Sequence, residues 1–211
     1  MALNKSLFIT LEGGDGTGKS SVAQKLAERF KAYNHETILT REPGGTPLGL
    51  ELRRILLHDG HQHSQEVQLL MLNAARLAHW EQVIQPNLQK GHHVLCDRFV
   101  DSTRVYQALS QNNSEKLLNR VNKLHQEFLP DANPDIVIVL DLDPKESIKR
   151  IQKRSSETNY FDDQPIRFHQ TIRDGFLKLA QQGEPYSVVN ASEPLDQVVQ
   201  KCWSIILSKL G

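Results

Sequence analysis

The sequence predicts a three-layer α/β protein: a single domain, residues 1–211, in which a five-stranded parallel sheet has helices on both faces. Three observations support this prediction. Apolar, β-branched runs alternate with helical patterns along the chain, which is typical of a parallel sheet. The run at 136–140 is continuously apolar, as expected of a strand buried on both faces. The first apolar run leads into a glycine-rich loop, and a helical segment follows that loop.

Each element follows from a local pattern. Short apolar and β-branched runs predict strands at 7–11, 37–40, 94–96, 136–142 and 187–189. Helical patterns between them predict helices at 19–31, 48–57, 65–89, 102–108, 114–128, 144–153, 166–181 and 194–210. The segment 155–165 is polar and irregular and separates two helical patterns. We therefore expect a small mobile lid at about 150–165 within the one domain.

Composition excludes several classes of protein. The chain has 25 Lys and Arg residues and 25 Asp and Glu residues, so its net charge is zero. A protein that coats nucleic acid without sequence preference would need an excess of basic residues. Cys96 and Cys202 lie far apart and make no disulfide framework. No signal peptide precedes the first strand, and no apolar run is long enough to cross a membrane. We expect a cytoplasmic protein with no nucleic-acid or membrane partner, whose histidines lie at the surface or in turns.

The glycine-rich loop has the pattern G-x-x-x-x-G-K-S between a strand and a helix, which indicates a phosphate-binding loop. Its backbone N–H groups can surround phosphate oxygens at the positive end of the following helix. Lys19 would reach the β- and γ-phosphates of a nucleotide, and the Ser20 hydroxyl would ligate Mg²⁺. A chance match to the four fixed positions is expected in only ~1% of chains of this length. The predicted nucleotide-binding residues are Gly13, Gly14, Asp15, Gly16, Thr17, Gly18, Lys19, Ser20 and Ser21.

A carboxylate and a guanidinium follow the third predicted strand. Asp97 is placed as in a Walker B segment, to reach Mg²⁺ directly or through water. The adjacent Arg98 could clamp phosphate oxygens with two parallel hydrogen bonds. The alternative is a simple ion pair between these two residues at the end of the strand. We expect no metal other than Mg²⁺ brought with the nucleotide.

Four further segments carry polar groups that could bind a ligand. A loop with two prolines and two glycines follows the second strand, and Arg53 lies about a helical turn beyond it. Leu72 and Arg76 share one helix face, and burying Arg76 without a partner would be costly. Ser102, Thr103, Tyr106 and Gln107 present polar groups on neighbouring faces, although a capped surface helix would show the same residues. Basic rows at Lys149, Arg150, Lys153 and Arg154 precede the lid, and either face solvent or deliver guanidinium groups to a phosphoryl group.

Together these segments resemble thymidylate kinases, along nearly the whole chain. The matching segments, in the same order, are 8–20, Arg-Glu-Pro-Gly-Gly-Thr at 41–46, Ala-Ala-Arg at 74–76, Cys-Asp-Arg-Phe at 96–99, Ser-Thr at 102–103, Tyr-Gln at 106–107 and Asn-Ala-Ser at 190–192. The resemblance implies a P-loop nucleoside-monophosphate kinase fold and a homodimer. It also implies transfer of the ATP γ-phosphoryl group to dTMP, giving dTDP and ADP, in dTTP synthesis for DNA replication.

The resemblance also implies roles for individual residues. Asp15 would bond the dTMP sugar, and Tyr106 would crowd that sugar and favour deoxyribose. Arg53 and Arg98 would hold the acceptor phosphate. Arg76 and Thr103 would read the thymine edge, and the loop at Asn190 would lie by the adenine. The full implied substrate set is Asp15, Glu42, Pro43, Arg53, Leu72, Arg76, Arg98, Ser102, Thr103, Tyr106 and Gln107, and the implied catalytic set is Lys19, Arg98, Arg150 and Arg154.

Three departures from the family pattern concern the same site. Leu72 stands where many relatives have a phenylalanine that stacks on thymine. The phosphate loop has no arginine, so the lid would supply one, from Arg150 or Arg154 or by a swing of Arg167. Ala-Leu-Ser at 108–110 replaces a glycine run. Two other functions stay open: a kinase of the same fold acting on another nucleotide, and a nucleotide-dependent switch protein. A guanine-specific switch would show Asn-Lys-x-Asp, whereas 122–125 reads Asn-Lys-Leu-His.

Overall fold

A five-stranded parallel sheet forms the centre of the structure, a computed structural model that describes residues 6–59, 63–110, 114–153 and 160–210. The strands are β1 (Phe8–Glu12), β2 (Thr37–Arg41), β3 (His93–Asp97), β4 (Ile136–Asp141) and β5 (Tyr186–Asn190). Their order across the sheet is β2-β3-β1-β4-β5. All five predicted strands are confirmed, with ends that differ from the prediction by one residue at most. The central strands β1, β3 and β4 are almost entirely buried, because helices cover both faces.

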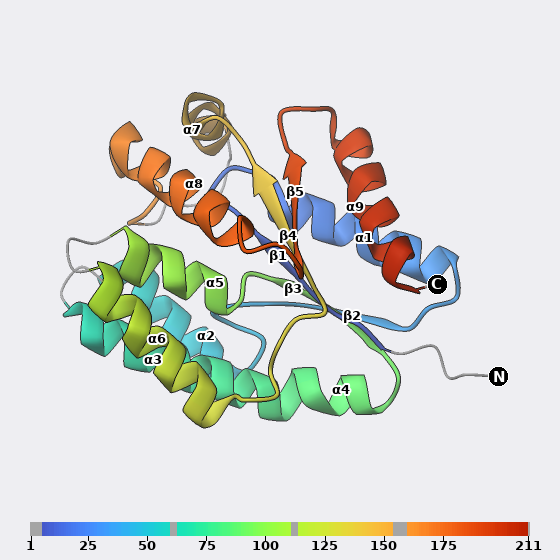
Figure 1. Ribbon diagram of the computed structural model, residues 1–211, viewed down its shortest axis with the longest axis horizontal. Coiled ribbons are helices and arrows are strands. Elements are labelled where there is room, and N and C mark those ends of the chain that lie inside the picture. The colour runs from blue at the N-terminus through green and yellow to red at the C-terminus, as the bar shows by residue number, and fades with distance from the viewer. Residues whose placement is uncertain (1–5, 60–62, 111–113, 154–159, 211) are drawn as a thin grey trace.

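Helices form a layer on each face of the sheet (Figure 1). On one face α1 (Lys19–Ala32) and α9 (Leu195–Leu210) pack together, with Phe30 against Trp203 in the core beneath them. On the other face lie α3 (Gln65–His79), α4 (Gln85–Gln89), α5 (Val100–Thr103), α6 (Ser114–Phe128) and α8 (Ile166–Ala180). The remaining helices, α2 (Pro47–Arg54) and α7 (Pro144–Lys153), follow the carboxyl ends of β2 and β4. The predicted three-layer architecture is therefore confirmed.

Three predicted helices are interrupted by π-helical segments. The long helix expected at 65–89 becomes α3, a π-helical segment at Trp80–Ile84, and α4. Pro86 lies at the start of α4 and has no N–H to continue the preceding ladder, so the pattern changes just before it. The other two segments are Ile55–Asp59 after α2 and Arg104–Leu109 after α5. Apolar spacing predicted helix in all three places but did not reveal the wider turns.

The expectation that histidines lie at the surface or in turns is wrong for four of them. His79, His93, His125 and His169 are buried. His93, for example, accepts a hydrogen bond at Nδ1 from the Leu7 backbone N–H (3.1 Å). An imidazole can be buried when a hydrogen-bond partner lies next to it in the fold. Such a partner can be far away in the chain, so the sequence alone does not reveal it.

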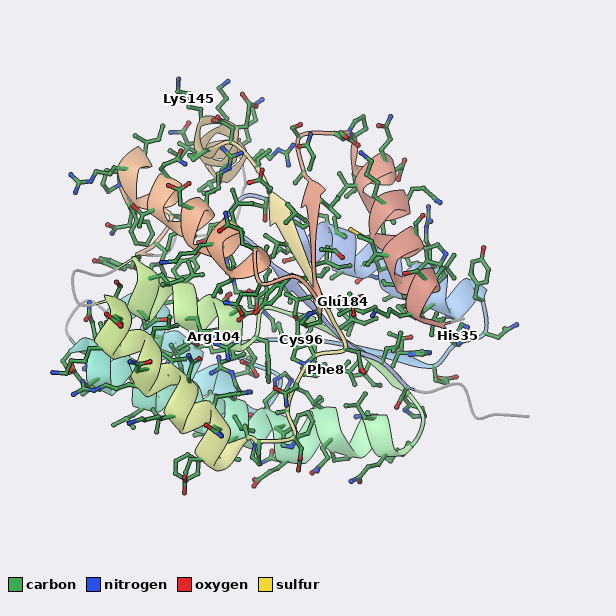
Figure 2. All side chains as sticks on the ribbon, viewed as in Figure 1. Phe8, His35, Cys96, Arg104, Lys145 and Glu184 are labelled. Atoms are coloured by element: carbon green, nitrogen blue, oxygen red, sulfur yellow. The ribbon has the colours of Figure 1, made fainter. Side chains whose placement is uncertain are left out.

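The interior and the surface otherwise follow the expected pattern. The labelled Phe8 and Cys96 lie within the molecule, whereas Lys145 projects outward from α7 (Figure 2). Within the described part of the chain, none of the helices is both long enough and apolar enough to span a membrane. The lid prediction covers residues that the structure describes only in part, because 154–159, including Arg154, lie outside the described residues.

Candidate functional site

A cavity of about 530 Å³ opens at the carboxyl ends of the strands. It brings together residues from segments far apart in the chain, as expected for a sheet of this type. The predicted site residues that line it are Asp15, Gly16, Thr17, Gly18, Lys19, Ser20, Ser21, Glu42, Pro43, Arg53, Leu72, Arg76, Asp97, Arg98, Ser102, Thr103, Tyr106, Gln107 and Arg150. Gly13 and Gly14 line a separate, smaller cavity, and Asn190 lines neither of the two.

The phosphate loop connects β1 to α1, and its glycines are required by the backbone. Gly13 and Gly16 have φ values of +134° and +76°, which side chains other than glycine rarely adopt. There is also no room: a Cβ on Gly13 would lie 2.5 Å from the Leu140 carbonyl oxygen. Lys19 folds back over the loop and donates from Nζ to the Gly13 (3.0 Å) and Gly14 (2.7 Å) carbonyl oxygens. Burial, and then the charge of Arg98, lower the pKa of Lys19 to about 8.

Ser20 and Asp97 meet across the loop. The Ser20 hydroxyl donates to Asp97 Oδ2 at 2.6 Å. The other oxygen, Asp97 Oδ1, is buried and has no hydrogen-bond partner among the described residues. A hydroxyl and a free carboxylate oxygen are the hard ligands that Mg²⁺ prefers. Across residues 6–59, 63–110, 114–153 and 160–210, no three His, Cys, Asp or Glu side chains come together as a metal site.

Arg98 lies between the phosphate loop and the helix after β3. Its backbone has φ +74°, an uncommon conformation that turns the side chain back over the loop. The guanidinium donates to the Gly13 carbonyl (3.1 Å), Ser102 Oγ (3.0 Å) and Asp15 Oδ1 (2.7 Å). Tyr106 donates its hydroxyl to Asp15 Oδ2 at 2.7 Å. Burial opposes the ionisation of Asp15, but the Arg98 and Lys19 charges outweigh it and hold the pKa of Asp15 well below its usual range.

Arg76 is fully buried and paired with a carboxylate. Its Nε donates to Glu42 Oε2 at 2.8 Å, so the charge is not buried alone. One terminal nitrogen donates to Thr103 Oγ1 (2.8 Å) and to the Phe99 carbonyl oxygen (3.3 Å). The other, Nη1, has no hydrogen-bond partner among the described residues, and Arg76 lines the cavity. Arg76 and Thr103, which the sequence analysis paired, are therefore in direct contact.

Further positively charged side chains lie near Arg76 in the lining of the cavity. Arg53 donates to the Pro43 carbonyl oxygen at 3.1 Å. Burial, then the neighbouring charges of Arg41 and Arg98, lower the pKa of Arg53 to about 10. Repulsion between guanidinium groups of this kind is relieved by an anion, so this region suits a second phosphate. Arg150 approaches from α7 and donates to the Ala191 carbonyl oxygen at 3.0 Å.

Sequence reasoning gave no role to several residues that build the site. Glu12 is buried at the end of β1 and accepts from the Phe99 backbone N–H (2.7 Å) and Ser102 Oγ (2.6 Å). Ser147 donates to the Asp15 carbonyl oxygen, and Phe161 lines the cavity with its ring 5.3 Å from that of Tyr106. A carboxylate at the end of an apolar strand was a usable signal for Glu12. The contacts of Ser147 and Phe161 depend on tertiary packing alone.

Comparison with known proteins gives one consistent result. A family model described as thymidylate kinase matches residues 11–202. A thymidylate kinase of Ruegeria pomeroyi is 37% identical over 207 residues, covering 97% of this chain and 96% of that protein. One from Caulobacter vibrioides is 37% identical, covering 99% and 100%. A crystal structure of thymidylate kinase from Ehrlichia chaffeensis aligns with a TM-score of 0.76 and 29% identity, covering 96% and 98%.

Glu12 makes the stability of the fold depend on pH. Burial, and then the charge of Asp101, raise its pKa from 4.5 to about 8. A raised folded-state pKa favours the protonated fold, so stability is full below pH 4.5 and is lost as pH rises to about 8. We expect Glu12→Gln, which imitates the protonated acid, to gain on the order of a few kcal/mol relative to the parent over that range.

Denaturant unfolding of both proteins at several pH values measures this difference. Glu127→Gln, an exposed carboxylate on α6, is the matched control and should leave the difference constant. Parallel pH dependences for the parent and Glu12→Gln would contradict the assignment.

Proposed function

The chain belongs to the thymidylate kinase family, and we infer that it catalyses the ATP-dependent phosphorylation of dTMP to dTDP. One observation supports this most directly. The phosphate loop and Lys19 line one part of a single cavity. The guanidinium groups of Arg53 and Arg98 line another part of it, next to the part lined by Arg76, which we call the Arg76 wall. Two phosphate-bearing molecules can therefore meet end to end in it, as transfer between a triphosphate and a monophosphate requires.

The ATP side of the site is proposed to be the phosphate loop. Its backbone amides and Lys19 would hold the β- and γ-phosphates. Ser20 and Asp97 fit Mg²⁺, because their oxygens are adjacent and Asp97 Oδ1 is unpartnered among the described residues. Mg²⁺ bound there would neutralise charge on the phosphates. The loop after β5 would lie by the adenine through Ala191 and Glu193, which line the cavity, while Asn190 accepts from Ser192 instead.

The acceptor side is proposed to be the wall formed by α3 and the segment after β3. Arg76 Nη1 and Thr103 would meet the oxygen-bearing edge of thymine, since the guanidinium can donate to a carbonyl oxygen and the hydroxyl can accept from the imino N–H. Asp15 and Tyr106 would adjoin the sugar. Leu72 and Phe161 both line the cavity, so an aromatic ring is present in the wall although Leu72 itself cannot stack. Phe161 would then supply part of the aromatic contact that many relatives obtain from a phenylalanine at the position of Leu72.

The proposed mechanism consists of positioning and charge neutralisation. The acceptor is a phosphate that is already anionic near neutral pH, so no general base is needed. Lys19, Arg98 and Arg150 would stabilise the negative charge on the transferring group. Arg150 is the lid arginine that the structure describes at the cavity, whereas Arg167 is exposed and does not line it. Arg154 stays part of the proposal from the sequence.

The oligomeric state and location are also proposed. We infer a homodimer, and the exposed Leu48, Leu50, Val67 and Leu70 on α2 and α3 supply apolar surface that a second copy could cover. We place the enzyme in the cytoplasm because both of its substrates are water-soluble nucleotides.

A panel of acceptors with ATP and Mg²⁺ tests the substrate assignment. We expect dTMP to have the highest kcat/KM among dTMP, dUMP, UMP, dCMP and dGMP. The thymine methyl group is worth only ~1 kcal/mol, so dUMP should follow within about tenfold. Cytosine presents an amino donor where thymine has a carbonyl, so dCMP should be at least ~10²-fold worse against Arg76. A higher value for another monophosphate would replace dTMP as the substrate.

Lys19→Ala tests the role of the phosphate loop. We expect phosphoryl transfer to fall by ~10²-fold or more, because a preorganised cation is removed from the transferring group. The fold should survive, since burial already disfavours the Lys19 charge. Coupled ADP release measures transfer, and circular dichroism and thermal unfolding check the fold. Unchanged turnover would remove Lys19 from the mechanism.

Binding of ATP should also take up protons. Lys19 has a pKa of about 8, and phosphate oxygens beside it would raise that pKa. At pH 8 we therefore expect uptake of about half a proton per ATP bound with Mg²⁺. Calorimetry in two buffers of different ionisation enthalpy measures the uptake, and Lys19→Ala should abolish it. Equal binding enthalpies in both buffers for the parent protein would contradict this account.

A further inference from the structure

His79 is a buried histidine that does not line the cavity, yet both of its ring nitrogens have partners. It is the last residue of α3, and its side chain is completely buried. Nε2 lies 2.7 Å from Thr40 Oγ1, and Nδ1 lies 3.0 Å from Glu42 Oε1. Both partners belong to the end of β2 and the loop that follows it. The ring therefore ties α3 to this loop.

The partners determine how the ring is protonated. An ionised Glu42 can only accept hydrogen bonds, so Nδ1 of His79 carries the hydrogen. In the neutral ring Nε2 then accepts from the Thr40 hydroxyl, and both contacts are satisfied. A fully satisfied buried network of this kind is rigid, because breaking one contact leaves a buried polar group unpaired.

Glu42 transmits this constraint to the cavity wall. One carboxylate oxygen contacts His79, and the other accepts from Arg76 Nε at 2.8 Å. Arg76 is also held by Thr103, which leaves Nη1 in the cavity wall. The direction of the Arg76 guanidinium thus depends on the position of the Glu42 carboxylate. His79 helps to fix that position through its contact with the other carboxylate oxygen.

The same ring also packs against Gly45 in the loop that follows β2. A Cβ on Gly45 would lie 2.4 Å from His79 Nε2, and Gly45 also has φ +75°, so the loop is seated closely on the imidazole. Pro43 in this loop accepts from Arg53. The loop therefore connects His79 to two of the cationic groups that face the proposed acceptor, Arg76 and Arg53.

We propose that His79 is a positioning residue for the acceptor nucleotide: its imidazole fixes the Glu42 carboxylate, and through it the guanidinium of Arg76 that discriminates between bases. This inference rests on the proposed function of the Arg76 wall. It assigns no contact between His79 and substrate, and it predicts effects on acceptor binding and base choice but not on ATP binding.

His79→Phe and His79→Asn test the proposal. Phenylalanine keeps the ring but removes both nitrogens, whereas asparagine can still place an N–H donor toward Glu42. For His79→Phe we expect the KM for dTMP to rise on the order of tenfold, because Glu42 loses a buried partner. The ratio of kcat/KM for dTMP over dCMP should fall by a similar factor. The KM for ATP should change by less than about twofold, and His79→Asn should recover part of the loss.

His93→Phe is the matched control. His93 is also buried and hydrogen-bonded, but its partners are the Leu7 backbone and the His35 ring at the amino end of the sheet, and it does not line the cavity. The His93→Phe variant should lose thermal stability but keep the KM for dTMP and the base preference of the parent. A purely structural role for His79 predicts that the two variants behave alike.

Several outcomes would overturn the proposal. A folded His79→Phe with parental KM values and base preference would do so, as would equal rises in the KM for dTMP and ATP. If His79→Phe does not fold, His79→Asn and Thr40→Val carry the test, since Thr40→Val removes only the hydroxyl that contacts Nε2. If the parent protein does not phosphorylate dTMP, the proposed function fails first; if it does and the variants match it, only the positioning role fails.

Discussion

The site depends on the way the carboxyl ends of three adjacent strands are held in register. Leu11 of β1 pairs with Asp97 of β3, and Arg41 of β2 pairs with the same residue. Two backbone hydrogen bonds extend these ladders: Arg98 N donates to Leu11 O, and Glu42 N donates to Asp97 O, both at 3.0 Å. The phosphate loop, the Asp97–Arg98 turn and the Glu42 loop therefore start from one rigid edge. Their side chains can meet without long flexible connections.

Buried charge is the second constraint, and it is met by pairing. The buried pair of Arg76 with Glu42 and the partly buried pair of Arg98 with Asp15 each place opposite charges within 2.8 Å. Removing one partner from such a pair would leave an uncompensated buried charge, which is far more costly than the pair itself. The pairs hold the guanidinium groups before substrate arrives, so little reorganisation is needed at the moment of transfer. Glu12 differs because it is buried and its hydrogen-bond donors among the described residues are a backbone N–H and a hydroxyl; burial and then the charge of Asp101 raise its pKa.

The departures from the family pattern act together at the acceptor wall. Leu72 provides an apolar surface but no ring, whereas Phe161, within the segment predicted as the lid, brings a ring to the same cavity beside Tyr106. The two side chains come from segments 89 residues apart, so their joint role is visible only once the chain is folded.

The sequence alone determined the strand–helix alternation, the parallel sheet and the phosphate loop, because these depend on local apolar patterns and on glycines that a backbone with positive φ requires. It also predicted Asp97, Arg98, Arg53 and Arg76 as site residues, and the structure places all four at one cavity. Only the tertiary structure decided that Arg76 is paired with Glu42, which His79 contacts, that Glu12 is buried, and that Asn190 does not line the cavity. Those outcomes depend on partners far apart in the chain, whose distances are set by packing and by the cost of leaving buried polar groups unpaired.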